Sequence, residues 1–493
     1  MKTKTNWQKT FIILILVIFL TNSCNKFYGV SPSTTIPASI GTNTPSSSLF
    51  KPGDPTATPL GSDITDPNYI KGVDAFYAGR DEEVIQLMSA VIEANPNLAP
   101  PYQYRGRAYW YLQDCSAGLA DEEKALSINP NYAAAWASRG LIDSCIGSDE
   151  QALEDYQKAL SIDPSLAFAH ENLGVYYYNH GEYEKSLEEY TLSAATDSNR
   201  AGAWTGKAQA QTQLGQYDKC IMNASKAIEI DVEKWIAYTN RAFCEQALGN
   251  YPAAIQDYKT YLKHNVTDAD VWYNLGSTQR DAGLPQEGVI SLSKALELNP
   301  NYYDANINRG LAYIDFGKYA EALADFNQAL KFSNNAVAYS GRGTAYYGLG
   351  KYDEAIADLK LATQMMPNRP HAFCVLALSY FKVERYQDAL NVAEVADQIA
   401  PDCGGQELFE VEAQSYYALG QYEQGITYIT QAFGRGQFYL TGYYYRGIMY
   451  DSIGKNKEAL QDLEFFLSSM KGSEDSYKDQ IADTKTRIKK LKP

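Results

Sequence analysis

Small and aromatic residues recur along most of the chain with a period of 34 residues, beginning near residue 65. When Ala133 is counted as position 1, small residues fall at positions 8, 15 and 20, and aromatic residues fall at positions 4 and 24. Twelve such repeats follow one another, starting at residues 65, 99, 133, 167, 201, 235, 269, 303, 336, 370, 406 and 440. A fixed period of this length predicts tandem helix–turn–helix units rather than one compact core.

Position 8 always carries a minimal side chain. It is glycine at 72, 106, 140, 174, 276, 310, 343 and 447, and alanine at 208, 242, 377 and 413. Position 20 is small in all repeats but the first, which has Val84. Two helices that cross closely at these positions leave no room for a larger side chain, so the pattern predicts a close crossing within each repeat.

This pattern resembles the tetratricopeptide repeat, whose signature is W-x2-L-G-x2-Y…A-x3-F…P. The first part of the signature is matched closely by the run Trp272-Tyr273-Asn274-Leu275-Gly276. The resemblance implies an all-α fold, a right-handed superhelical solenoid of about twelve repeats over residues 65–473, with a capping helix over 474–493. Proline at position 32 occurs in only six repeats, so the others must end their second helix differently.

The first 24 residues are typical of an export signal. Lys2, Lys4 and Lys9 precede the apolar run 11–20, which is shorter than the roughly 20 residues that span a bilayer. The segment closes on Cys24 and resembles a bacterial lipobox, which implies cleavage before this cysteine and its lipidation. Two alternatives stay open: an ordinary cleaved signal with an incidental cysteine, and an uncleaved anchor.

Residues 25–64 form a predicted linker. Residues 31–60 contain six Pro, six Ser and six Thr. Such a composition buries too little surface to offset its ordering entropy, so we expect a disordered tether between an anchored N-terminus and the repeats.

The first helix of each repeat is expected to line a concave face. Over half of the 40 tyrosines fall at framework positions 4, 11, 17 and 24 and are expected in the core. Other aromatic residues fall at positions 5 and 12, on the helical stripe that holds extended peptides in tetratricopeptide proteins. The candidate binding residues are Trp110, Tyr178, Tyr273, Tyr347, Phe381, Tyr417 and Tyr444.

Position 6 adds a second set of candidates, Asn172, Asn240, Asn274 and Asn308. An amide both donates and accepts hydrogen bonds, so a row of asparagines can clasp a peptide backbone. The set resembles the asparagine ladder of the O-GlcNAc transferase repeat domain. The alternative is that these are tolerated helix-surface residues.

Position 7 carries arginine in six repeats, at residues 105, 139, 241, 309, 342 and 446. We expect these arginines to pack between helices or pair with local acids rather than bind a ligand.

Carboxylate-clamp repeats, which hold an acidic tail, need lysine at position 5, and none occurs at that position in the second to sixth repeats.

Six cysteines follow Cys24, and neighbours along the sequence fall on elements expected to touch. The candidate disulfides are Cys115–Cys145, Cys220–Cys244 and Cys374–Cys403. An exported chain permits such pairs, and we expect at least one to be oxidised. The alternative is six buried thiols acting as small hydrophobes.

The chain carries a net charge of −16, which argues against a nucleic-acid partner. Its four histidines form no HExxH motif, and no Walker A loop or GxSxG elbow occurs. We therefore expect no catalytic residue, metal or cofactor.

The leading hypothesis is a non-catalytic scaffold in a bacterial envelope, lipid-anchored to a membrane, that binds a protein or peptide. One alternative is an assembly or secretion factor for pili, outer-membrane proteins or exopolysaccharide; an enzyme is disfavoured.

Overall fold

The computed structural model describes residues 64–492 except 402 and 471–475. These described residues contain 25 helices and no strand, which confirms the predicted all-α repeat solenoid. The predicted signal, Cys24 and all but the last residue of the predicted linker lie outside the described residues. The helices alternate between the first and second helix of successive repeats, which we call A and B helices.

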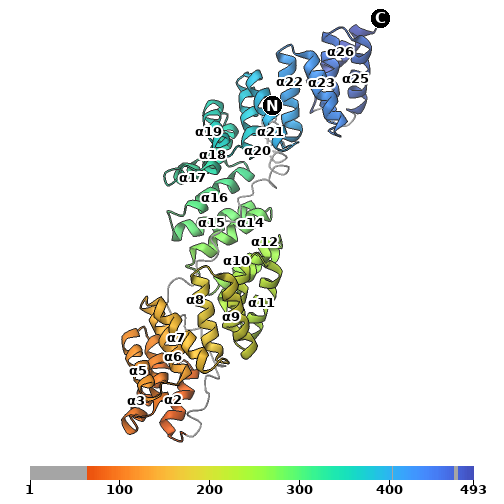
Figure 1. Ribbon diagram of the computed structural model, residues 1–493. Coiled ribbons are helices and arrows are strands. Elements are labelled where there is room, and N and C mark those ends of the chain that lie inside the picture. The colour runs from red at the N-terminus through yellow and green to blue at the C-terminus, as the bar shows by residue number, and fades with distance from the viewer. Residues whose placement is uncertain (1–63, 402, 471–475, 493) are drawn as a thin grey trace, which may run out of the picture. The chain divides into compact units, whose positions relative to one another are not determined.

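The chain divides into two compact bodies after Ala282. The N-terminal body (64–282) consists of α2 (Pro67–Tyr77), α3 (Asp81–Ala94), α4 (Ala99–Tyr111), α5 (Cys115–Ile128), α6 (Ala133–Cys145), α7 (Asp149–Ile162), α8 (Ala167–Asn179), α9 (Tyr183–Thr196), α10 (Ala201–Gln213), α11 (Tyr217–Ile230), α12 (Trp235–Ala247), α13 (Tyr251–Leu262) and α14 (Ala269–Asp281). Apart from the last helix of the chain, the even-numbered helices are A helices, and each one from α2 to α12 packs against the B helix that follows it (Figure 1).

The C-terminal body (283–492) begins with the B helix of the seventh repeat. It consists of α15 (Pro285–Leu298), α16 (Tyr303–Asp315), α17 (Tyr319–Ala329), α18 (Ala336–Gly348), α19 (Tyr352–Met365), α20 (Pro370–Lys382), α21 (Tyr386–Ile399), α22 (Gly405–Ala418), α23 (Tyr422–Gly434), α24 (Leu440–Ser452), α25 (Asn456–Ser469) and α26 (Lys478–Leu491).

Each A helix is followed, at position 15 of its repeat, by a residue in the left-handed backbone region. This residue is glycine in most repeats, for example Gly147 with φ 79°. The next N–H then reaches back to a carbonyl five residues earlier, as Ser148 does to Asp143 at 2.9 Å. The exceptions are Gln113 and Glu384, with φ 66° and 60°. The turn therefore forms in their repeats despite a side chain that disfavours it.

Several B helices end in a turn that does not need proline. At position 31 of three proline-free repeats, Asp197, Asp231 and Asn265 accept a hydrogen bond from the backbone N–H two residues later. These side chains satisfy a backbone donor and turn the chain toward the next A helix. The same turn accompanies the proline in other repeats, for example at Asn129.

The A and B helices of one repeat cross closely at positions 8 and 20. A Cβ atom added at Gly118 would lie 2.8 Å from the carbonyl oxygen of Gly106, and one added at Gly140 would lie 3.0 Å from that of Ala152. The first distance is shorter than real Cβ contacts, and the second is tighter than most of them. The small residues at both positions are thus explained by backbone contact between the two helices.

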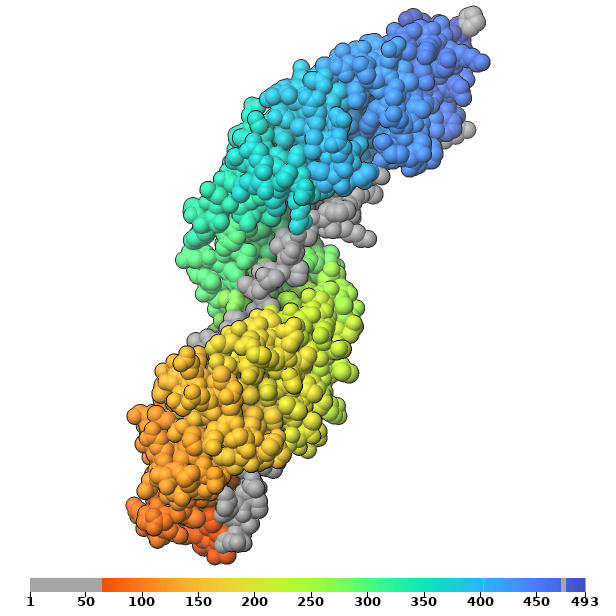
Figure 2. All heavy atoms as spheres, viewed as in Figure 1, coloured from red at the N-terminus to blue at the C-terminus, as the bar shows by residue number. Residues whose placement is uncertain are grey.

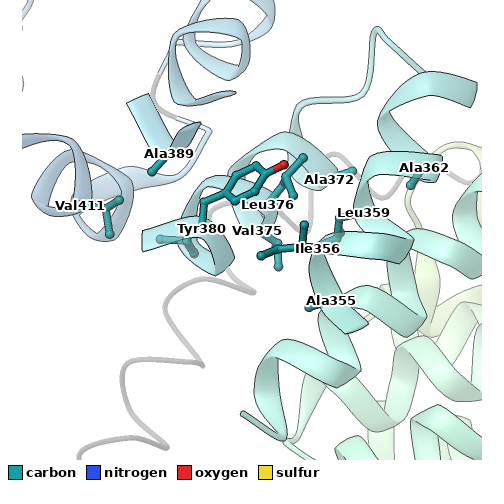
Figure 3. Packing of buried hydrophobic residues seen from close by; sticks show 11 residues of the cluster. Ala355, Ile356, Leu359, Ala362, Ala372, Val375, Leu376, Tyr380, Ala389 and Val411 are labelled. Atoms are coloured by element: carbon teal, nitrogen blue, oxygen red, sulfur yellow. The ribbon is translucent and has the colours of Figure 1, made fainter. Parts of the chain in front are cut away.

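Between the repeats, apolar side chains from A and B helices interlock. In the C-terminal body, Val375, Leu376 and Tyr380 of α20 lie beside Ile356 and Leu359 of α19, as Figure 3 shows. Leu359 is fully buried. Truncating it to alanine should cost about 3 kcal/mol, because a tightly packed core cannot collapse into the cavity.

The last helix, α26, packs against α25 at the end of the C-terminal body, where Figure 2 shows its dark blue atoms. Ile481 of α26 is buried against Phe466 and Met470. Arg487 of α26 forms ion pairs with Asp451 at 2.6 Å and with Asp483 at 2.8 Å. An apolar face that would otherwise end the stack of repeats is thereby covered.

Candidate functional site

The A helices form the inner layer of each body. Successive A helices approach one another within 8 Å between Cα atoms, whereas the described B helices make few or no such approaches to one another. Closer spacing on one side makes that side the inner one. The candidate binding residues all lie on these A helices.

In the N-terminal body, the three aromatic candidates are largely buried. Trp110 is 5% exposed, Tyr178 8% and Tyr273 2%. The hydroxyl of Tyr178 accepts a hydrogen bond from Gln213 at 3.0 Å, which joins two neighbouring A helices. These side chains therefore contribute packing to the inner layer.

In the C-terminal body, the four remaining aromatic candidates are only partly buried. Tyr347 and Phe381 at position 12 each pack against the tyrosine at position 17 of the same repeat, with 5.7 Å between ring centroids. Tyr417 contacts Tyr422 in the same way at 5.5 Å. One side of each ring is thus held in place within its repeat.

Three of these candidates meet in one cavity of about 480 Å³. Phe381, Tyr417 and Tyr444 line it from three successive A helices, and Asp479 and Asp483 line it from α26. Its volume falls in the range of sites for small molecules and side chains, about 300–1,000 Å³. Sequence analysis identified the rings but missed the cavity and the carboxylates that α26 adds.

Hydrogen bonds hold part of this cavity in place. The hydroxyl of Tyr444 donates to Asp483 at 3.0 Å, and Asp483 also accepts from Arg487. Burial, with the nearby charge of Asp483, raises the pKa of Tyr444 above its ordinary value. The tyrosine is therefore a neutral donor, and Asp483 lies between this hydroxyl and the guanidinium of Arg487.

The asparagines at position 6 are buried. Asn172 and Asn308 donate their side-chain N–H groups to carbonyls of their own helices, Phe168 at 2.7 Å and Asp304 at 3.0 Å. The Nδ2 atoms of Asn240 and Asn274 have no hydrogen-bond partner among the described residues. The four amides thus do not form one equivalent row, and their role as a peptide ladder stays a prediction.

Two glycines show which way position 6 faces. A Cβ atom added at Gly206 would lie 2.2 Å from the ring of Tyr190, and one at Gly341 would lie 2.3 Å from the ring of Phe326. Both rings are at position 24 of the preceding repeat. Position 6 therefore faces the preceding B helix, which gives its residues a packing role between repeats.

Sequence analysis missed that an arginine and a glutamate, Arg107 and Glu122, are both buried in the N-terminal body. Arg107 is 1% exposed, and its guanidinium carbon lies 4.7 Å from the ring centroid of Phe76 and 4.5 Å from that of Phe168. Glu122 is fully buried, and burial raises its pKa well above the ordinary value although the charge of Arg107 opposes this. The available signal was a carboxylate at position 24, where other repeats have an apolar or aromatic residue.

The arginines at position 7 form ion pairs that recur in six repeats. Each donates two hydrogen bonds of 2.6–2.9 Å to an aspartate sixteen residues later. The pairs are Arg105–Asp121, Arg139–Asp155, Arg241–Asp257, Arg309–Asp325, Arg342–Asp358 and Arg446–Asp462. The expectation that these arginines pair with local acids is confirmed.

All six described cysteines are joined by disulfides. The bonds are Cys115–Cys145, Cys220–Cys244 and Cys374–Cys403, with Cα–Cα distances of 6.9, 6.4 and 7.0 Å. Each bond lies within one body. The first two tie a B helix to the next A helix, so they reinforce the stacking of repeats.

Two further properties concern the described residues only. None of their helices has the length and apolar character needed to cross a membrane. They also contain no group of three or more His, Cys, Asp or Glu residues that could hold a metal ion.

Comparison with known families identifies the repeat. A model described as TPR repeat matches residues 146–181, and models described as tetratricopeptide repeat match 201–231, 245–302, 292–324 and 336–369. Uncharacterized protein MJ0572 of Methanocaldococcus jannaschii is 33% identical over 69 residues, which is 14% of this chain and 80% of that protein.

Solved structures show weaker likeness. Cut9–Hcn1, an APC/C hetero-tetramer, is 13% identical with a TM-score of 0.42, covering 86% of this chain and 96% of that one. YrrB, titled a TPR protein with an unusual peptide-binding site, is 19% identical with a TM-score of 0.35, covering 38% and 96%. MamA is 25% identical with a TM-score of 0.31, covering 32% and 92%.

The repeat matches, together with the helix pairs, place the chain in a class of protein-interaction scaffolds. It is a tetratricopeptide-repeat protein.

Proposed function

We propose that this protein is an exported, lipid-anchored, non-catalytic scaffold that binds a protein or peptide on the inner layer of A helices. The observation that carries the binding proposal is the cavity in the C-terminal body, where Phe381, Tyr417 and Tyr444 expose ring surface. Aromatic side chains provide large contact area at low entropic cost, because they have only two rotatable bonds.

A matched pair of phenylalanines tests this surface. Phe381 lies in the cavity, whereas Phe332 is 47% exposed between α17 and α18 and does not line it. We expect the full chain to retain a protein from an extract of its own cells, and the Phe381→Ala variant to lose it. The Phe332→Ala variant should retain it. Equal capture by all three folded proteins would contradict binding at the inner layer.

The asparagines provide a second arm of the same experiment. A variant with Asn240→Ala and Asn274→Ala removes the two amides whose Nδ2 atoms lack a partner in the part of the chain that the structure describes. Loss of the captured protein by this variant, with an unchanged melting curve, would support backbone capture by these amides. Unchanged capture would leave the aromatic surface as the binding determinant.

Export and lipid anchoring rest on the first 24 residues of the sequence. In bacterial cells, the wild-type protein should incorporate a labelled fatty acid and sediment with membranes, and a Cys24→Ser variant should do neither. A secreted wild-type protein without label would indicate an ordinary cleaved signal. An unlabelled, membrane-bound protein that keeps its first residues would indicate an uncleaved anchor.

A further inference from the structure

The cavity at the end of the C-terminal body combines aromatic walls with negative charge. Phe381, Tyr417 and Tyr444 supply the rings, and Asp479 and Asp483 stand on the first two turns of α26. None of the described residues that line the cavity is a lysine or an arginine. A cation that enters would therefore meet ring faces and carboxylates together.

The charges around the cavity are not balanced. Arg487 is shared between Asp451 and Asp483, so one guanidinium faces two carboxylates. Asp479 is exposed and forms no ion pair with any described residue. This group of four charged residues thus carries a net charge of −2, and an incoming cation is attracted without displacing an existing pair.

We propose that this cavity binds the side chain of a lysine or arginine from a protein partner. The proposal rests on the proposed function and names the chemistry of one subsite on that surface. The cationic group lies against the rings of Tyr417 and Phe381, whose negative π faces attract it, and beside the carboxylate of Asp479. The bond from Tyr444 to Asp483 holds that side of the cavity in place.

The same features disfavour other occupants. An anionic group would face Asp479 and Asp483, and none of the described lining residues is a cation that could receive it. A purely apolar group would desolvate these carboxylates without providing a partner. A sugar could stack on the rings and hydrogen-bond to the carboxylates, and it is therefore included as a competing probe.

The test uses the full chain in detergent and peptides that differ only in charge. The probes are an acetylated glycine–arginine–glycine amide and the same peptide with citrulline in place of arginine. Their affinities are measured by saturation-transfer NMR at low and at high salt. We expect the arginine peptide to bind about fivefold more tightly than the citrulline peptide, with the difference shrinking at high salt.

Two variants test whether the preference for the arginine peptide arises in this cavity. Asp479→Asn removes an exposed carboxylate from the first turn of α26, and Glu458→Gln removes one from the first turn of α25, outside the cavity. The Asp479→Asn variant should lose most of the preference for arginine, while Glu458→Gln should keep it. Melting curves of both variants check that the fold is retained.

Three results would overturn the proposal. These are equal binding of the two peptides by the wild-type protein, equal loss of preference in both variants, and binding of maltoheptaose at the cavity with no preference for arginine. The proposed function fails separately, when the captured protein is retained by the Phe381→Ala variant. If the Phe381→Ala variant loses the captured protein but the wild-type protein shows no preference for arginine, the scaffold function stands and only the cation subsite is excluded.

Discussion

The two bodies use the same repeat but build different inner layers. In the N-terminal body, Trp110, Tyr178 and Tyr273 are at most 8% exposed. In the C-terminal body, Phe381 and Tyr417 occupy the same position 12 as Trp110 and Tyr178, yet they remain partly exposed and border a cavity. A side chain at one repeat position can therefore serve as packing in one body and as open surface in the other.

Their buried carboxylates differ as well. Glu122 in the N-terminal body lies near a guanidinium enclosed by two phenylalanine rings. Glu412 in the C-terminal body accepts a hydrogen bond from Tyr428 and feels the charge of Asp397. Each carboxyl group has a nearby guanidinium that opposes the rise in its pKa and a nearby carboxylate that adds to it. Among the described residues, however, only Glu412 receives a hydrogen bond. A substitution at Glu412 should therefore change the C-terminal body alone.

The largest expected effect concerns the disulfides, of which the N-terminal body has two and the C-terminal body one. Replacing Cys220 and Cys244 by alanine should lower the free energy of unfolding of the N-terminal body by about 3 kcal/mol, because the unfolded chain regains loop entropy. Hydrogen exchange read by mass spectrometry in urea reports each body separately.

The matched control is replacement of Cys374 and Cys403, which should weaken the C-terminal body instead. A third measurement counts thiols on the unfolded wild-type protein with and without reductant. Equal counts, together with unchanged stability in both variants, would show that the cysteines are thiols and would remove this difference between the bodies.

Removing the arginine of a position-7 ion pair should have the next largest effect, and the loss of stability should be equal in the two bodies. Arg105→Met in the first and Arg446→Met in the second each leave a buried aspartate without its guanidinium. We expect a loss of about 2 kcal/mol from each body, because an uncompensated buried charge is costly. In a double variant that also carries Asp462→Leu, most of the loss should be recovered in a urea titration. Equal losses in the single and double variants would mean that the arginine acts through packing of its stem.

Glu412 should make the stability of the C-terminal body depend on pH. Burial raises the pKa of Glu412 to about 8, from an ordinary value of 4.5. Between these values the folded carboxyl binds a proton and the unfolded one does not, so stability falls as pH rises and levels off above about pH 8. The slope attributable to Glu412 should be about 1.4 kcal/mol per pH unit.

A Glu412→Gln variant should lose this slope in the C-terminal body and should gain stability relative to wild type as the pH approaches 8. Denaturant midpoints from pH 5 to pH 9 provide the measurement. If the slopes of the two proteins coincide, Glu412 is ionised in the folded state near neutral pH, and it does not cause the pH dependence of the C-terminal body.

The smallest effect should be a stabilisation shared by both bodies. Gln113 and Glu384 occupy the left-handed backbone region that glycine occupies in the other ten repeats. Replacing either by glycine should raise the stability of its body by about 0.5–1 kcal/mol, because the steric strain exceeds the entropic cost of glycine. Differential scanning calorimetry would detect the shift, and Gly434→Ala, at a helical glycine with open space around it, provides a control without left-handed strain.

Much of the fold could be predicted because each repeat is a local unit. Tyr183 and Tyr217 at position 17 mark the first residues of α9 and α11, and Gly147 marks the end of α6. The arginines at position 7 and their aspartates lie sixteen residues apart in the same repeat, so the pairing needed only the local hairpin. The candidate site was harder, because Phe381 and Asp479 are almost a hundred residues apart and meet only where α26 folds back.

The sequence alone determined the helix pairs, their close crossings and the class of protein, because a 34-residue period records contacts made within each repeat and to its neighbour. Only the tertiary structure decided which faces stay open. It turned position 6 toward the preceding B helix, enclosed Arg107 between Phe76 and Phe168, and left an acidic aromatic cavity under α26. These outcomes depend on how successive helices meet across repeats, and a periodic pattern does not specify the volume that their side chains fill.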